Sequence, residues 1–411
     1  MDGARTIGQR AALGAVERMV AGATPHAILF VGEAGVGKTT LALDLAAALL
    51  CSAAEGVGRP CRTCRGCRLV ASGNHPDLHR VTPTGPGGQI RIGDRNDPEA
   101  GSVRALLSEL ALLPVEGGAR VAIVEAAHRM NEDAQSALLK TLEEPPPGTV
   151  IILCADEEER LLETVRSRCT RHRLGPVGVR DIEGFLVDRG VADPPTAARL
   201  ARIAHGRPGV ALVYALAPEA ALVRSELTRS LLDLLGGPLA ERLAMARDLL
   251  VRSADLVSAL EAVVDAGREA SAVDRSAGSR GRAAGQRGPA ASRGGPAPIG
   301  AEGLDAPGGS PDDEPAAKVP AAARRRAAAQ LIEIWRDVAR DAALAGLGER
   351  RSLRDTGLAD ELAGTAAPVS SAHLTRFLER LDRAGELLES NVVPELLVDD
   401  LVIRWRPRAA A

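Results

Sequence analysis

Gly32-Glu-Ala-Gly-Val-Gly-Lys-Thr39 is the stretch that decides the fold of this 411-residue chain. Its glycines let backbone N–H groups converge on an anion, and the lysine and threonine complete a loop of the kind that cradles phosphates. The apolar run 27–31 predicts a buried strand, and the run from Thr39 to Leu50 predicts the helix that follows. Such a helix directs its positive N-terminal end at bound phosphates. The sequence therefore predicts a strand–loop–helix unit that binds a nucleotide.

We expect the whole loop and the first turn of the helix to bind ATP. The predicted ligands are Gly32, Glu33, Ala34, Gly35, Val36, Gly37, Lys38, Thr39 and Thr40. Lys38 would reach the β- and γ-phosphates, and the Thr39 hydroxyl would bind Mg²⁺. The alternative is a glycine-rich turn that binds no ligand. Such a turn does not require a lysine, and Lys38 is one of only three lysines in the chain.

Two further apolar runs, 121–124 and 150–153, predict strands of the same sheet. Between them a helix is predicted from Asn131, a favoured N-cap residue, through Leu142 to the prolines that begin at Pro145. Strands that alternate with helices indicate an α/β domain with a parallel sheet, whose ligands lie at the carboxyl ends of the strands.

The strand at 121–124 ends in Glu125-Ala126, and this pair bears on hydrolysis. Turnover of a nucleotide needs an acidic group for the metal and a second group that orients the attacking water. Glu125 could hold Mg²⁺, but Ala126 has only a methyl group where the second carboxylate is expected. The sequence therefore predicts that ATP binds and that its turnover is slow or absent.

Four cysteines follow the predicted helix at metal-ligand spacing: Cys51, Cys61, Cys64 and Cys67. Four thiolates are the number that a closed tetrahedral zinc site requires, and they leave no open position for catalysis. The sequence predicts structural Zn²⁺. Two alternatives are unliganded surface thiols, and three cysteines with an outside ligand such as His75.

The composition limits the possible partners. A net charge of −3 excludes nucleic-acid binding by bulk charge alone, so a DNA contact would need a local basic patch. Arg59, Arg62, Arg65 and Arg68 surround the cysteines and could form such a patch, or simply a solvated face. Because no signal peptide or run of about 20 apolar residues is present, we expect a soluble, cytoplasmic protein with no membrane contact.

The second half of the chain reads as helical. Residues 176–216 give a small helical unit, and helices continue to the end except in 276–320, whose Gly, Ala, Pro, Arg and Ser residues predict a disordered insertion. The spacing of Leu374, Phe377, Leu378 and Leu381 predicts an amphipathic helix that packs on a partner surface.

Three more segments, taken with the glycine loop and the cysteines, carry a family resemblance. They are Gly73-Asn-His-Pro-Asp77, the segment from Arg129 to Pro145 with its Leu-Leu-Lys-Thr-Leu-Glu-Glu-Pro string, and Arg166-Ser-Arg-Cys169. Together they resemble the delta-prime subunits of the bacterial DNA polymerase III clamp loader, a branch of the AAA-type P-loop ATPases.

The resemblance implies three domains and a ring-shaped assembly. They are an AAA-type α/β domain (1–175) with a zinc module at 51–67, a helical lid (176–216), and an all-α collar (217–411) interrupted at 276–320. The implied partners are gamma/tau and delta subunits in a hetero-pentamer, the sliding clamp, and primer-template DNA within the replication machinery at the nucleoid. Arg168 would be an arginine finger donated to the ATP of a neighbouring subunit.

Two departures separate this sequence from the gamma/tau motors that it also resembles. Glu125-Ala126 replaces their Asp-Glu pair, and Gly209 stands where their lid carries an arginine. The strand end at Asp156 lacks their Thr or Asn. We therefore predict a subunit that binds ATP with little hydrolysis. The alternatives are an active DNA-stimulated ATPase of gamma/tau type and a zinc-containing repair protein that binds single strands.

Overall fold

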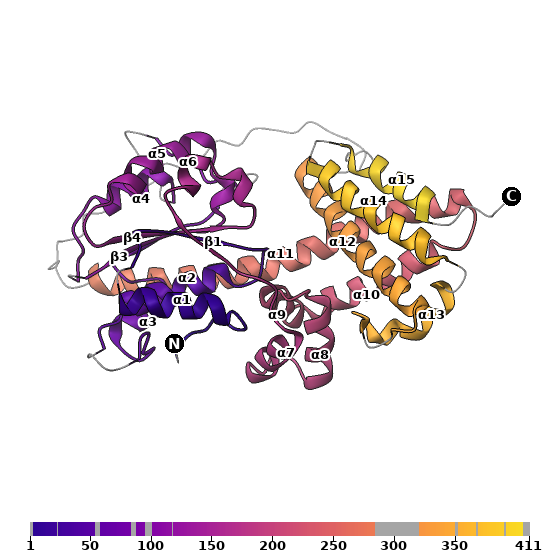
Figure 1. Ribbon diagram of the computed structural model, residues 1–411, viewed down its shortest axis with the longest axis horizontal. Coiled ribbons are helices and arrows are strands. Elements are labelled where there is room, and N and C mark those ends of the chain that lie inside the picture. The colour runs from indigo at the N-terminus through magenta and orange to yellow at the C-terminus, as the bar shows by residue number, and fades with distance from the viewer. Residues whose placement is uncertain are drawn as a thin grey trace, which may run out of the picture.

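The computed structural model describes residues 3–22, 24–53, 58–83, 88–94, 101–116, 118–283, 320–349, 352–366, 369–389 and 392–405 (Figure 1). An α/β unit forms the N-terminal part, and helices joined by short connections follow the sheet in the described residues. None of the helices in these ranges is both long and apolar enough to cross a bilayer.

Five parallel strands make the sheet, in the spatial order β2-β3-β4-β1-β5. Their bounds are β1 (Ala27–Val31), β2 (Leu78–Val81), β3 (Arg120–Val124), β4 (Thr149–Ala155) and β5 (Thr170–Arg173). The central strands β1, β3 and β4 are fully buried and were predicted from their apolar runs. The edge strands β2 and β5 were not predicted, because their sequences Leu-His-Arg-Val and Thr-Arg-His-Arg are largely polar.

Helices cover both faces of this sheet. On one face, α1 (Arg10–Ala21) and α2 (Lys38–Leu49) pack against Ile28, Phe30 and their neighbours. On the other face lie α4 (Val103–Leu110), α5 (Glu132–Glu143) and α6 (Glu163–Arg166), as Figure 1 shows. Two 3-10 turns, η1 (Ala127–Arg129) and η2 (Glu158–Arg160), follow β3 and β4, and α3 (Arg65–Ser72) lies beside α2.

The predicted boundaries of α5 are confirmed, and their cause is local. Asn131 is the N-cap, since its side-chain oxygen accepts a hydrogen bond of 3.1 Å from the Ala134 amide. The helix ends at Glu143, two residues before Pro145, which cannot continue it.

In the described part of the chain, nine helices follow the sheet. They are α7 (Val179–Asp188), α8 (Pro194–Ile203), α9 (Pro208–Leu216), α10 (Pro218–Asp233), α11 (Leu239–Ala283), α12 (Ala321–Gly346), α13 (Ala359–Ala366), α14 (Ser371–Glu389) and α15 (Pro394–Trp405), with the short turn η4 (Thr356–Leu358). Their buried side chains form one continuous cluster from Val177 to Trp405. This core crosses residue 216, where the sequence divides lid from collar, so the two predicted domains share one interior.

Of two expectations about these helices, the structure confirms one and corrects part of the other. The predicted stripe on α14 is confirmed, because Leu374, Phe377 and Leu381 are buried and α14 packs on α12. The helix α11 runs to Ala283, past the predicted start of the disordered insertion at residue 276. The remainder of that insertion, 284–319, lies outside the described residues, and its disorder stays a prediction.

Candidate nucleotide and metal sites

The glycine loop joins β1 to α2 in the predicted way. Gly35 and Gly37 have φ angles of 82° and 111°, a left-handed region that favours glycine, and α2 begins directly at Lys38. Because β1 lies between β4 and β5, the loop stands at the carboxyl edge of the sheet beside the end of β4. This is where parallel sheets bind ligands.

The ammonium group of Lys38 has three partners. It donates to the carbonyl oxygens of Gly32 at 2.7 Å and Glu33 at 2.8 Å. Its third partner is the Asp156 carboxylate, at 2.6 Å. An ammonium group has three N–H donors, so all of them are used. Lys38 is only 6% exposed, and its charge is therefore balanced inside the protein.

Asp156 is held in place from two sides. The strand register sets Val31 opposite Ala155, so the residues that follow, Gly32 and Asp156, emerge next to each other. The Asp156 amide donates to Nδ1 of His128 at 3.2 Å. Burial lowers the pKa of His128, so the ring is neutral and can accept this hydrogen bond.

Glu125, the expected Mg²⁺ ligand, already has a cationic partner. Nε of Arg80, on β2, donates to a Glu125 carboxylate oxygen at 3.0 Å, and a second guanidinium nitrogen contacts the same oxygen. Behind the loop, burial raises the pKa of Cys154 to about 12, so this thiol beside Thr39 is neutral. Magnesium binding would require Glu125 to exchange its partner.

Helix α9, in the predicted lid, packs directly onto the glycine loop. The Gly209 amide donates to the carbonyl of Gly35 at 2.9 Å. A Cβ at position 209 would lie 3.1 Å from both Cα and O of Gly35, which is tighter than ordinary packing. No residue larger than glycine fits at position 209 without a shift, which agrees with the predicted absence of an arginine there.

Arg168 lies just after α6, at the surface. Its side chain is 35% exposed, forms an ion pair with Glu143 at 2.5 Å and donates to the Thr164 carbonyl at 2.8 Å. Its predicted role is not tested by the geometry of one chain.

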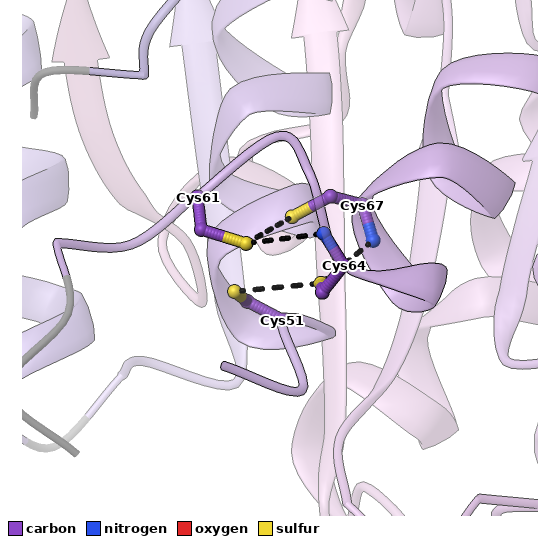
Figure 2. Close-up of side chains that lie close together, drawn as sticks. All are labelled: Cys51, Cys61, Cys64 and Cys67. Carbon is purple, nitrogen blue, oxygen red and sulfur yellow. Dashed lines mark hydrogen bonds between the residues drawn. The ribbon is translucent and has the colours of Figure 1, made fainter. Parts of the chain in front are cut away.

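The four predicted cysteines converge, with all their sulfur atoms within 4.8 Å of one another (Figure 2). Cys51 lies 3.8 Å from Cys64, and Cys61 lies 4.0 Å from Cys67, between sulfur atoms. A tetrahedral ion with metal–sulfur bonds of about 2.3 Å separates its sulfurs by ~3.8 Å, so the spacing fits.

Backbone amides favour the thiolate forms of Cys61 and Cys64, whereas burial raises the pKa of Cys67 to about 12. The Cys64 and Cys67 amides each donate to the sulfur of the cysteine three residues before, at 3.3 Å. Burial opposes the ionisation of Cys64, but hydrogen bonds from the Cys67 amide and from Ser52 outweigh it and lower the pKa to about 5. These residues can hold a metal ion.

His75, the alternative fourth ligand, lies elsewhere. Its Nδ1 accepts a hydrogen bond from the Asp77 amide at 3.1 Å, and its Nε2 lies 3.7 Å from Glu116. The cluster that could hold a metal in the described residues consists of cysteines alone, so a three-cysteine site with His75 is wrong.

The arginines near the cysteines make a weaker basic patch than the sequence suggested. Arg59 donates to the Ala53 carbonyl, Arg62 binds Asp44, and Arg65 pairs with Glu116. With three of the four cations engaged inside the chain, a nucleic-acid contact would have to compete with these bonds.

Comparison with known proteins shows which proteins the N-terminal part of the chain is similar to. The family described as "DNA polymerase III, delta subunit" matches residues 9–178. The delta-prime subunit of DNA polymerase III from Bacillus subtilis is 37% identical over 175 residues, which are 43% of this chain and 49% of that protein. The Escherichia coli delta-prime subunit is 35% identical over 192 residues, 47% of this chain and 55% of that protein. The resemblance to delta-prime subunits is confirmed for this part of the chain.

Other relatives are more distant. The tau subunit from Escherichia coli is 32% identical over 187 residues, 44% of this chain and 27% of that protein. A solved gamma subunit-related protein from Thermotoga maritima covers 96% of this chain and 99% of its own, at 15% identity and a TM-score of 0.39, too low to bear on the fold. The chain spans about half the length of the delta-prime subunits that it matches.

The structure adds residues to the delta-prime-like region (9–178) that the sequence did not single out. Arg80 had no signal, because it stands in an unpredicted edge strand. Asp44 did have a sequence signal, since it is a lone carboxylate in the apolar run of α2. It is 1% exposed and accepts hydrogen bonds from Thr6 and Arg62, joining the N-terminal segment to the cysteines.

Proposed function

We propose that this chain is a clamp-loader subunit of DNA polymerase III of the delta-prime type. Its partners would be gamma/tau and delta subunits in a hetero-pentamer that loads the sliding clamp onto primed DNA during DNA replication. The observation that carries the proposal is the family match over 9–178, which includes both the glycine loop and Arg168.

In this proposal the chain acts on a neighbour's nucleotide more than on its own. Arg168 would extend to the ATP of the adjacent subunit and stabilise charge on its γ-phosphate, a contribution worth ~10³–10⁵ in rate where such fingers operate. Its exposure supports this role, since its partners Glu143, the Thr164 carbonyl and the Ser167 hydroxyl all lie at the surface and could be released.

The chain's own site would bind ATP with Mg²⁺ through Gly32–Thr40, with Thr39 and Glu125 as metal ligands, and would hydrolyse it slowly or not at all. Ala126 supports this, because its methyl group cannot orient an attacking water. The pairing of Glu125 with Arg80 supports slow turnover further, because this carboxylate must leave its ion pair before it can bind Mg²⁺.

The cysteine cluster would hold one structural Zn²⁺ through Cys51, Cys61, Cys64 and Cys67. A zinc ion with four thiolates stabilises a fold and has no open position for chemistry. Its residues fit because the sulfurs have tetrahedral spacing and the amide hydrogen bonds favour the thiolate forms of Cys61 and Cys64.

Arg168→Ala in a reconstituted clamp loader tests the main proposal. We expect a loss of at least about tenfold in DNA-stimulated ATP hydrolysis, because the neighbour's transition state loses a charge partner, while the assembly stays intact by gel filtration. Arg180→Ala changes another exposed arginine and serves as the control. Hydrolysis that is unchanged by Arg168→Ala would refute the role of this residue.

An active ATPase of gamma/tau type is the second candidate. The complete glycine loop and the identity to a tau subunit favour it. Rapid ATP turnover by the purified chain, abolished by Lys38→Ala, would support this candidate over the first.

A further inference from the structure

Lys38 presents a question that the proposed ATP site leaves open. A lysine in this loop reaches the terminal phosphates as a point charge. Here its three donors are already used by Gly32, Glu33 and Asp156. Any phosphate that contacts this ammonium group must therefore displace one of the three partners.

Of these partners, Asp156 is the one that resembles a phosphate. It is the only anion among the three, and its distance of 2.6 Å is that of a charge-assisted hydrogen bond. The two carbonyls belong to the loop itself and would stay close to the lysine. Asp156 comes instead from the end of the neighbouring strand β4, on the open edge of the sheet.

The backbone of Asp156 is held close to the glycine loop. Its backbone is fixed by the hydrogen bond to His128, and the Gly32 amide donates to the carbonyl of the preceding Ala155 at 3.3 Å. A γ-phosphate that replaced its carboxylate on Lys38 would remain next to that carboxylate. Two like charges at such a separation repel each other strongly in a partly buried site.

The surrounding charges do not relieve this repulsion. His128 is neutral because burial lowers its pKa, and Arg80 is paired with Glu125. The lid offers no cation at position 209, because Gly209 itself contacts the loop.

We propose that Asp156 is a specificity-determining residue, which holds Lys38 in place of a γ-phosphate and makes the site prefer a nucleoside diphosphate to a triphosphate. This inference rests on the proposed nucleotide site and adds its selectivity. The chain would then keep its loop ordered without ATP, and a diphosphate would bind on the loop amides without meeting Asp156.

The test measures binding of fluorescent ADP and ATP, with Mg²⁺, to the full chain by anisotropy. We expect the wild type to bind ADP at least about tenfold more tightly than ATP. Asp156→Asn keeps the shape but removes the charge, and should improve ATP binding about tenfold or more with less than about threefold change for ADP. Thermal unfolding of each variant checks that it is folded.

Three further variants sharpen the result. Glu157→Gln removes the adjacent carboxylate, which pairs with Arg160 at the surface, and should leave the ratio of affinities unchanged. Lys38→Ala removes the positive charge beside the loop amides and should weaken the binding of both nucleotides. Asp156→Thr replaces Asp156→Asn if the latter does not fold.

Equal affinity of the wild type for ADP and ATP would overturn the inference, and so would a ratio that Asp156→Asn does not change. If neither nucleotide binds to the wild type or to Asp156→Asn, the nucleotide site itself is wrong. The role of Arg168 is measured in the reconstituted assembly, so its failure is distinguishable from all of these outcomes.

Discussion

At the scale of single residues, three buried or partly buried charged side chains are paired with opposite charges. Lys38, Glu125 and Asp44 are each paired inside the delta-prime-like region. A buried ion pair contributes little net stability when intact, but removing one partner is costly because the other charge stays buried without compensation.

Asp44→Ala should therefore destabilise the protein. Asp44 accepts from the Arg5 and Thr6 amides, the Thr6 hydroxyl and Arg62, and all of these donors would lose their acceptor. We expect a loss of about 3 kcal/mol in the free energy of unfolding, measured with urea. Asp188→Ala, at an exposed position, is the control and should change it by less than about 0.5 kcal/mol. A similar small loss for Asp44→Ala would show that Arg62 and Thr6 find other partners.

At the scale of elements, the cysteine cluster ties the N-terminal segment to α2. Arg62 stands between Cys61 and Cys64 with a φ of 60°, a left-handed conformation within the turn. From there it donates to the Gly3 carbonyl and to Asp44. Any interaction that orders this turn therefore also orders residues 3–9, which precede α1.

Cys64→Ser should remove the metal and loosen residues 3–9. We expect the wild type to carry one zinc per chain and the variant much less than one, by elemental analysis, because a closed site needs all four thiolates. Amide hydrogen exchange at residues 3–9 should rise in the variant. Cys169→Ser alters a cysteine outside the cluster and should keep both properties. Unchanged metal content in Cys64→Ser would contradict the four-cysteine site.

At the scale of the whole molecule, a buried charge cluster joins the predicted lid to the predicted collar. Asp337 on α12 accepts from His205 at 2.9 Å and also pairs with Arg224 and Arg354. Arg207 lies next to the contact between the glycine loop and α9. It pairs with Glu333, which also lies on α12. The loop, the lid and the collar are thus connected by consecutive contacts.

This cluster predicts a dependence of stability on pH. Burial, reinforced by Arg354, lowers the pKa of His205 to about 3 from its usual value near 6.5. Between these values the unfolded chain binds a proton that the folded chain does not, so stability falls as the pH falls below about 6.5. We expect up to about 1.4 kcal/mol per pH unit between pH 6 and pH 4 from this group.

His205→Asn should reduce that slope, and asparagine tolerates the φ of 55° at this position. The measurement is urea unfolding at pH 7, 6, 5 and 4 for both proteins. If the two slopes are the same, His205 is not the group that links the lid–collar contact to pH.

Local patterns were enough for much of this protein. The glycine spacing predicts the loop, three apolar runs predict the central strands, Asn131 and Pro145 predict the limits of α5, and four cysteines predict their own cluster. Each of these follows from near neighbours in the chain, through backbone sterics, capping or the short reach of a turn.

The partners of the charged groups were decided only by the tertiary structure. Asp156 meets Lys38 because β4 lies next to β1, Arg80 meets Glu125 because an edge strand adds beside β3, and Gly209 meets Gly35 because the lid folds back. These contacts join residues from 45 to 174 positions apart, and no periodicity or spacing in the sequence encodes them. The sequence determined that a glycine loop joins a strand to a helix, and the packing of distant elements decided which charges it meets.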